Sequence, residues 1–314
     1  MIRSALAAVL LAAPLALPAS AAPEVPLFGG AFAATWHDGK AELAGYALTF
    51  PRYGEERTGT AVAITVTEPF SWEPRVKAGG ADTFGVVKLN LMEDFPTGVY
   101  DYNLMTSAFV AAEPVEGLPA GAPVKLTFTA QEWCGHAFQQ DVFFPDKLEH
   151  RSFSYFEGKA EKAGFFRLDE PLYAEDALFL WARGLAAPAV DAGEEAAVSL
   201  YRSAAVVQLT HVPPRIDAAV LERAAETTQM DTAIGRIAVR EATVKVERSE
   251  APAVEHAFWV EEAPPHRVVK WTRSDGFEAV LIGVDRMPYW SLNGRGGEEA
   301  LARIGLEKRP PLTP

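Results

Sequence analysis

The alternation of apolar and polar residues over short segments constrains the fold of this chain more than any other feature. In Phe84–Met92, which reads FGVVKLNLM, Lys88 and Asn90 alternate with valine and leucine. This period of two favours a β-strand with one apolar and one polar face. Segments rich in β-branched and aromatic residues recur between turn-forming Gly, Pro, Asp and Asn. In the first half of the chain they are Glu42–Phe50, Thr60–Glu68, Gly98–Val110, Val124–Trp133, Phe138–Phe143, Ser152–Phe156 and Phe165–Leu168.

The second half of the chain continues this pattern after one predicted helix. Residues 172–185 carry Leu178, Trp181 and Leu185 at helical spacing, and acidic residues crowd the first turn. Small and turn-forming residues over 186–196 then mark a boundary. The strands predicted beyond it are Ala197–Val212 (one strand or a pair), Ile216–Gln229 (whose alanines and acidic residues also suit a helix, although its alternation favours a strand), Gly235–Arg248, Glu255–Glu262, Arg267–Arg273 and Glu278–Gly283.

Many strands and a single helix indicate a mainly β fold. We expect a curved antiparallel sheet, or sheets, or a half-barrel, with the helix at about residues 172–185 packed against it. The chain divides into an N-terminal β-rich region, residues 22–185, and a C-terminal β-meander region, residues 196–314. The pattern leaves open whether the two regions share one sheet.

The first 21 residues have the organisation of an export signal. A single positive charge, Arg3, precedes an apolar run that ends before the small residues 19–21. We expect cleavage near Ala21 and a periplasmic or secreted location. Pro14 and Pro18 interrupt the apolar run, which is shorter than the roughly 20 residues of a membrane-spanning helix. No later stretch of the sequence predicts a transmembrane segment.

The charge balance excludes several classes of partner and chemistry. Lys and Arg number 29 against 42 Asp and Glu, a net charge of −13. Binding to nucleic acid or to an anionic lipid surface requires clustered basic residues, and only small groups such as Lys308-Arg309 occur. The sequence also has no P-loop, no dinucleotide-binding glycine fingerprint and no Gly-x-Ser-x-Gly elbow. We therefore expect no nucleic-acid partner and no cofactor.

The C-terminal third of the chain carries a resemblance to a known family. Thr232 and Gly235 fill a Thr-x-x-Gly turn, Ile237 stands where an aromatic residue is usual, and residues 258–260 form an FWV strand. With the closing strand EAVLIG, this meander resembles that of a domain-of-unknown-function family of exported bacterial β-rich proteins. The resemblance implies a curved antiparallel sheet similar to lipoprotein-carrier half-barrels. It implies no catalytic residues.

Polar residues on neighbouring strands form a first candidate site. Asp101 and Asn103 share a face of their strand, as Lys88 and Asn90 do in the strand before. A regular hairpin predicts Asn90 opposite Asp101 and Lys88 opposite Asn103. This polar face is either the wet side of a half-exposed sheet or the inner side of a groove. In the second case the ligand-binding residues are Lys88, Asn90, Asp101, Asn103, Glu132, Trp133 and His136.

The only cysteine of the chain, Cys134, forms a second candidate site. Because free cysteine is among the most buried residue types, we expect Cys134 to be a buried apolar residue. As a nucleophile, it would use His136 as its base and Glu132 to orient that base. As a metal ligand, it would join these two residues and His37 or Asp38, but the spacing matches no established zinc signature and no metal is predicted. An intermolecular disulfide is a further alternative.

Together these features favour a non-enzymatic function. We expect an exported, soluble protein that binds an apolar or amphipathic small molecule, or a lipid of the envelope, in a concave sheet face. One alternative is an enzyme that uses Glu132, Cys134 and His136. Another is an envelope scaffold or interaction protein that uses its sheet edges.

Overall fold

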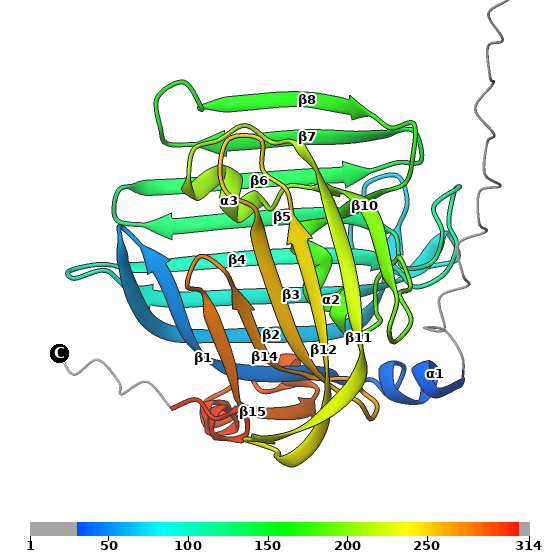
Figure 1. Ribbon diagram of the computed structural model, residues 1–314, viewed down its shortest axis with the longest axis vertical. Coiled ribbons are helices and arrows are strands. Elements are labelled where there is room, and N and C mark those ends of the chain that lie inside the picture. The colour runs from blue at the N-terminus through cyan, green and yellow to red at the C-terminus, as the bar shows by residue number, and fades with distance from the viewer. Residues whose placement is uncertain (1–29, 308–314) are drawn as a thin grey trace, which may run out of the picture.

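A computed structural model describes residues 30–307 and shows a mainly β protein. The predicted signal peptide, residues 1–21, lies outside the described residues. The described strands form one 15-stranded sheet in the order β8-β7-β6-β5-β4-β3-β2-β1-β15-β14-β13-β12-β11-β10-β9 (Figure 1). The strands are β1 (Ala41–Arg52), β2 (Glu55–Ser71), β3 (Thr83–Pro96), β4 (Asp101–Ala111), β5 (Pro123–Glu132), β6 (Gly135–Phe143), β7 (Lys147–Ser154), β8 (Glu161–Arg167), β9 (Leu172–Ala174), β10 (Glu195–Tyr201), β11 (Ile216–Thr232), β12 (Gly235–Val246), β13 (Val254–Glu261), β14 (Val268–Arg273) and β15 (Glu278–Met287).

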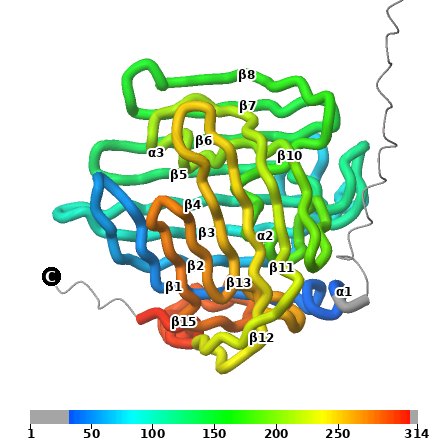
Figure 2. Tube along the Cα trace, in the orientation of Figure 1, coloured from blue at the N-terminus to red at the C-terminus, as the bar shows by residue number. Residues whose placement is uncertain are grey.

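The sheet is antiparallel throughout, except that the short β9 runs parallel to β10. It consists of two meanders, β1–β8 and β10–β15, which meet where β1 pairs with β15. The two regions predicted from the sequence therefore contribute strands to one sheet. Figure 2 shows that this sheet curves back on itself, so that β11–β13 cross in front of β4–β7. The expectation of a curved antiparallel sheet with a packed helix is confirmed.

Short helical elements lie inside the curved sheet, at its borders and, in the case of η4, on its outer face. Within the predicted helix, Leu172–Ala174 form β9, and helical turns run only from Glu175 to Ala182. All five residues of α2, LFLWA, are buried, because α2 contacts the inner sides of both meanders. The helical elements are α1 (Gly30–Trp36), η2 (Glu175–Ala177), α2 (Leu178–Ala182), α3 (Ala204–Leu209), η3 (Tyr289–Ser291) and η4 (Gly297–Ile304).

The segment Ala197–Val212 is only partly the strand or strand pair that its pattern predicts. Its first residues complete β10, but Ala204–Leu209 form α3, which packs against β5. The Asp176 carboxylate accepts a hydrogen bond from the backbone N–H of Ala204 at 3.0 Å and so binds the first turn of α3. Apolar residues of α3 such as Ala204 and Val207 are buried in the interior. In the sequence, a short apolar run of this kind looks the same whether it forms a buried helix or a buried strand.

The C-terminal segment crosses the outer face of the sheet where the two meanders meet. Gly45 of β1 and Gly283 of β15 pair across this joint. A Cβ atom on either glycine would overlap the backbone of Ile304, the last residue of η4. The two glycines therefore form the slot into which η4 packs.

A buried cluster of ions joins η2 to β11 and to the segment that follows β12. Arg248 donates hydrogen bonds to Glu175 at 2.6 Å and to Asp217 at 2.5 Å. Arg202 donates two further bonds to Asp217, and His256 lies 3.2 Å from Glu175. Burial alone would raise the pKa of Glu175, but the hydrogen bond to His256 and the charge of Arg248 hold this pKa well below its usual range.

Candidate functional site

A cavity of about 350 Å³ lies beside α2, at the border of the curved sheet. We call it the loop cavity, because it is bounded by α1, by the segment 183–192 that follows α2, and by the segment 260–266 at the end of β13. Small-molecule sites usually measure about 300–1,000 Å³, so a small ligand fits this volume. Its apolar wall includes Phe32, Trp36, Trp181, Leu185, Val190 and Val260.

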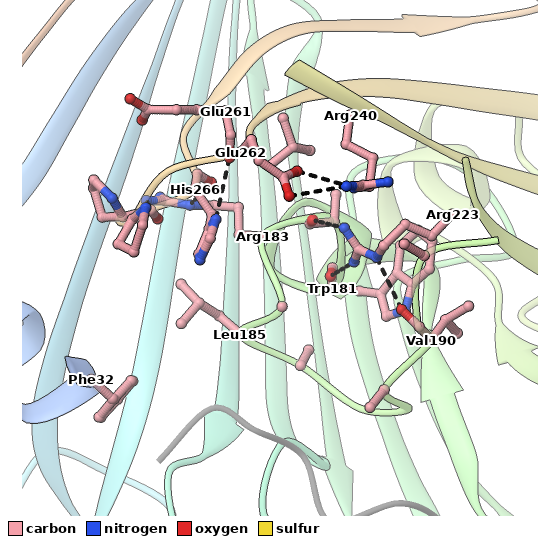
Figure 3. A pocket seen from close by; sticks show the side chains of 18 of the residues that line it. Phe32, Trp181, Arg183, Leu185, Val190, Arg223, Arg240, Glu261, Glu262 and His266 are labelled. Atoms are coloured by element: carbon pink, nitrogen blue, oxygen red, sulfur yellow. Dashed lines mark hydrogen bonds and ion pairs between the residues drawn. The ribbon is translucent and has the colours of Figure 1, made fainter. Parts of the chain in front are cut away.

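Arg223 fixes the segment that forms one wall of the loop cavity. Its guanidinium donates hydrogen bonds to the carbonyl oxygens of Trp181, Ala182 and Val190, at 3.3, 3.1 and 3.0 Å (Figure 3). The Trp181 indole N–H donates to the carbonyl of Pro188 at 3.0 Å. Partial burial lowers the pKa of Arg223. These bonds satisfy carbonyls at the end of α2 and hold the wall in one conformation.

Two more arginines lie at the polar end of the loop cavity, and both are paired within the protein. Arg240 binds the Glu262 carboxylate through two hydrogen bonds of 3.0 and 2.9 Å, which lower the pKa of Glu262. Arg240 also donates to the carbonyls of Ala224 and Ala225, where β11 bulges away from β12. Arg183 is buried and forms an ion pair with the buried Glu42 at 2.7 Å.

His266 supplies a ring nitrogen that the protein leaves available. Its Nδ1 lies 3.2 Å from the carbonyl oxygen of Glu261. Because a carbonyl oxygen only accepts, Nδ1–H donates, and in a neutral imidazole Nε2 is then the acceptor. Within residues 30–307, Nε2 makes no hydrogen bond, and Figure 3 shows the ring hanging into the cavity towards Leu185. His266 has a φ of +58°, a left-handed conformation that costs a residue other than glycine on the order of 1 kcal/mol. The arrangement suits binding of a molecule with an apolar body and one hydrogen-bond donor.

The polar residues predicted on β3 and β4 lie on the outer face of the sheet. Their neighbours Leu89 and Tyr102 belong to the inner core instead. Lys88 pairs with Glu68 at 2.9 Å, and Asn90 accepts a hydrogen bond from Ser107 at 2.8 Å. The alternative in which this face closes into an inner pocket is therefore wrong.

The predicted register of β3 and β4 is also wrong. Asn90 pairs with Ser107 and Lys88 with Phe109, whereas Asp101 lies opposite Pro96 and Asn103 opposite Asp94. The cause is that β3 continues through residues 93–96, since Phe95 reaches the inner core. Asn103 therefore lies in register with Gln131 and His136 at one end of the sheet, several residues along β3 from Lys88.

Glu132, Trp133, Cys134 and His136 lie at the tip of the hairpin between β5 and β6. Glu132 pairs with Gly135, which leaves Trp133 and Cys134 as a two-residue turn. Cys134 is exposed, so the expectation of burial is wrong, and Trp133 is 77% exposed. The sequence suggests burial only because it does not show that the strand ends before Cys134.

The surroundings of Cys134 do not activate its thiol. The Glu132 carboxylate accepts a hydrogen bond from the Cys134 backbone N–H at 2.6 Å. Hydrogen bonding to Glu132 raises the pKa of the Cys134 thiol, whereas a nucleophilic cysteine requires a lowered pKa. Within residues 30–307, no group of three His, Cys, Asp or Glu side chains is placed to hold a metal ion.

Alkylation of Cys134 by iodoacetamide is expected to require a higher pH than alkylation of an unperturbed cysteine, whose pKa is about 8.5. Replacement of Glu132 by glutamine removes the carboxylate and should return the midpoint of the rate profile towards that value. The measurement is the alkylation rate between pH 6 and pH 11, followed by mass spectrometry. A midpoint well below 8.5 would instead support a nucleophilic role.

An acid–histidine–serine chain also lies inside the sheet. His150 Nδ1 is 2.8 Å from Asp141 Oδ1, and His150 Nε2 is 3.2 Å from the Ser152 hydroxyl. Tyr201 and Gln139 donate to the two oxygens of the same Asp141 carboxylate. All five side chains are buried. We assign this network a structural role, because its bonds satisfy polar groups that water does not reach.

Sequence reasoning does not find the loop cavity, because its walls come from distant parts of the chain. Arg223 and Arg240 have the pattern of ordinary polar strand residues. The one local signal is His266, which follows Pro264-Pro265 in a tight turn between two strands. The sequence pattern there indicates only a strand entry.

Comparisons with known proteins give a fold likeness and no function. No protein-family model matches the chain, and no curated protein matches it. A solved structure that is similar is that of a β-barrel-like protein of a domain of unknown function, DUF1849, from Brucella abortus. It is 12% identical, covers 79% of this chain and 98% of its own, and has a TM-score of 0.46. Over residues 30–307, no helix has the length and apolar character needed to span a membrane.

Proposed function

We propose that this protein is exported and binds a small amphipathic molecule in the loop cavity. The observation that carries the proposal is an apolar wall combined with His266 Nε2, an acceptor directed into the cavity. The apolar part of the ligand packs against Trp36, Trp181 and Leu185, and its hydroxyl or amide group donates to His266. The export signal expected in residues 1–21 and the resemblance to lipoprotein-carrier half-barrels support a periplasmic or secreted binding protein.

The binding position differs from the open concave face expected from the sequence. α2 and α3 fill the inside of the curved sheet, so that face offers no free surface beside them. The loop cavity, in contrast, leaves apolar side chains next to unfilled space. Covering apolar surface contributes about 25 cal/mol per Å², which favours a ligand there.

Replacement of Ala189, which lines the loop cavity, by phenylalanine is expected to weaken binding at least about tenfold, because the larger ring occupies the ligand volume. The probe is octan-1-ol, which has an apolar chain and one hydroxyl donor. Binding is measured as the change in tryptophan fluorescence, since Trp36 and Trp181 both line the cavity.

The matched control is phenylalanine in place of Ala302, an exposed residue of η4 that does not line the cavity. This variant should bind octan-1-ol as the unmodified protein does. Equal affinity in the Ala189→Phe variant would remove the loop cavity as the binding site. Native mass spectrometry of protein purified from its own envelope then identifies a natural ligand, if one is retained.

A further inference from the structure

The strand β8 forms an open edge of the sheet. Among the strands that the structure describes, it pairs with β7 alone, and Figure 1 shows it as the outermost strand. Six of its seven residues are exposed, and Phe165 is 61% exposed. An exposed strand of this length presents a row of unpaired backbone N–H and C=O groups, to which another strand can bind. The opposite edge, β9, is only three residues long.

The outward-facing charges of β8 lie at its two ends and have opposite signs, whereas its third charge, Lys162, is on the inner side opposite the buried Ser152. Glu161 is the first residue and Arg167 the last. Within residues 30–307, neither forms an ion pair, although many other charged residues of the sheet do. Glu161 and Arg167 face the outer side of the sheet, because their partners on β7 are the outward-facing Phe153 and Lys147. Ala163 and Phe165 lie between them on the same face.

Geometry restricts how two copies of β8 can pair symmetrically. In an antiparallel pair, residues directly opposite each other point to the same face. One residue must therefore lie opposite its own copy, and the two-fold axis passes midway between the two. Centring on Ala163 or on Phe165 shortens the ladder, and in both cases neither Glu161 nor Arg167 lies opposite a residue of opposite charge in β8. Only centring on Gly164 pairs all seven residues, and it places Glu161 of each copy opposite Arg167 of the other.

We propose that β8 pairs with β8 of a second copy of this chain, antiparallel and centred on Gly164. Two Glu161–Arg167 ion pairs then lie on the outer face of the sheet, one on each side of the two-fold axis. Between them, Phe165 of each copy packs against Ala163 of the other. Gly164 lies beside the axis. Apart from its chain neighbours, no atom of residues 30–307 lies within 4 Å of the position that a Cβ would take there. The result is a two-fold dimer in which both sheets continue through one ladder. We choose a second copy of the chain as the partner because Glu161 and Arg167 have opposite charges and lie opposite each other when β8 pairs with itself.

Charge reversal tests the dimer. Glu161→Arg places two arginines opposite each other twice in the dimer, and Arg167→Glu does the same with two glutamates. Each single variant is expected to weaken dimerisation at least about tenfold in sedimentation-equilibrium experiments, and the double variant should restore it. Lys162→Glu, which changes the charge of β8 without opposing a like charge, should change dimerisation little. All three positions are exposed, so folding is preserved.

A single cysteine beside the axis tests the register. In a Cys134→Ser background, Gly164→Cys should form a disulfide-linked dimer, because directly opposed Cα atoms lie about 4.5–5.5 Å apart and disulfides span about 4.4–6.8 Å. Lys162→Cys in the same background should not, because it lies four residues from its own copy along the ladder. A monomeric protein at every concentration, or a double charge variant that stays monomeric, overturns the proposal. So does a dimer that Cys134→Ser alone abolishes, since a Cys134 disulfide then forms it.

Discussion

Methionine in place of Arg248 is expected to lower the free energy of unfolding by about 3 kcal/mol. The Arg248 side chain is 5% exposed and bonds the carboxylates of Glu175 and Asp217, which are equally buried. Removing its charge leaves Glu175 with His256 and the backbone N–H of Ser203, and Asp217 with Arg202. The two buried carboxylates are then only partly neutralised. Urea unfolding measures the loss, and the melting temperature should fall by roughly 5–10 °C.

The matched control is methionine in place of Lys245, whose ion pair with Glu247 is 59% exposed on both sides. Exposed pairs contribute little, so this variant should stay within about 0.5 kcal/mol of the unmodified protein. Equal losses in the two variants would show that burial of the Arg248 cluster does not matter to stability.

Glutamine in place of Glu93 is expected to stabilise the protein at pH 8 by about 1–3 kcal/mol and to change its stability little near pH 4. Burial raises the pKa of Glu93 to about 7, although the charge of Arg273 opposes this rise. An unfolded glutamate has a pKa of about 4.3. Between these two values the folded protein holds a proton that the unfolded chain has released, so its stability falls as the pH rises from about 4 to about 7. Glutamine cannot ionise and avoids that loss.

Urea unfolding at steps between pH 4 and pH 8 measures this difference. The control is glutamine in place of Glu55, whose side chain is 68% exposed, and its stability should follow the unmodified protein at every pH. Asp176 has a pKa raised by burial to about 7 in the same way, so the remaining slope of the Glu93→Gln variant reports on that second carboxyl. Parallel curves for the Glu93→Gln variant and the unmodified protein would contradict the argument.

Local pattern predicts the strands of this chain well and their pairing poorly. Ile216–Gln229 illustrates the first point: its alternation predicts a strand, and it lies within β11 despite its helix-favouring alanines and acids. Residues 93–96 illustrate the second, because EDFP has the composition of a loop yet continues β3. Burial of Glu93 and Phe95 depends on strands that lie far away in sequence, so local propensity cannot foresee it.

The candidate sites differ from the sequence prediction for the same reason. Cys134 and His136 draw attention because their side chains are chemically reactive, yet both are exposed at a hairpin. The loop cavity depends on Arg223 reaching across from β11 to hold the carbonyls that follow α2. Such a contact joins separate elements, and a single sequence carries no local trace of it.

The joint between β1 and β15 has a consequence for how the chain acquires its fold. Every other antiparallel neighbour in the sheet is adjacent in sequence, so each meander can form from local hairpins. The β1–β15 pair joins residues between 229 (Thr49 with Glu278) and 246 (Ala41 with Met287) positions apart, and closing so long a loop is entropically costly. During synthesis β1 remains an open edge until the last strand has emerged, and η4 can enter its glycine slot only after that. Completion of the fold therefore depends on the final residues of the sheet, and a nascent chain that stalls before β15 exposes β1 to other chains.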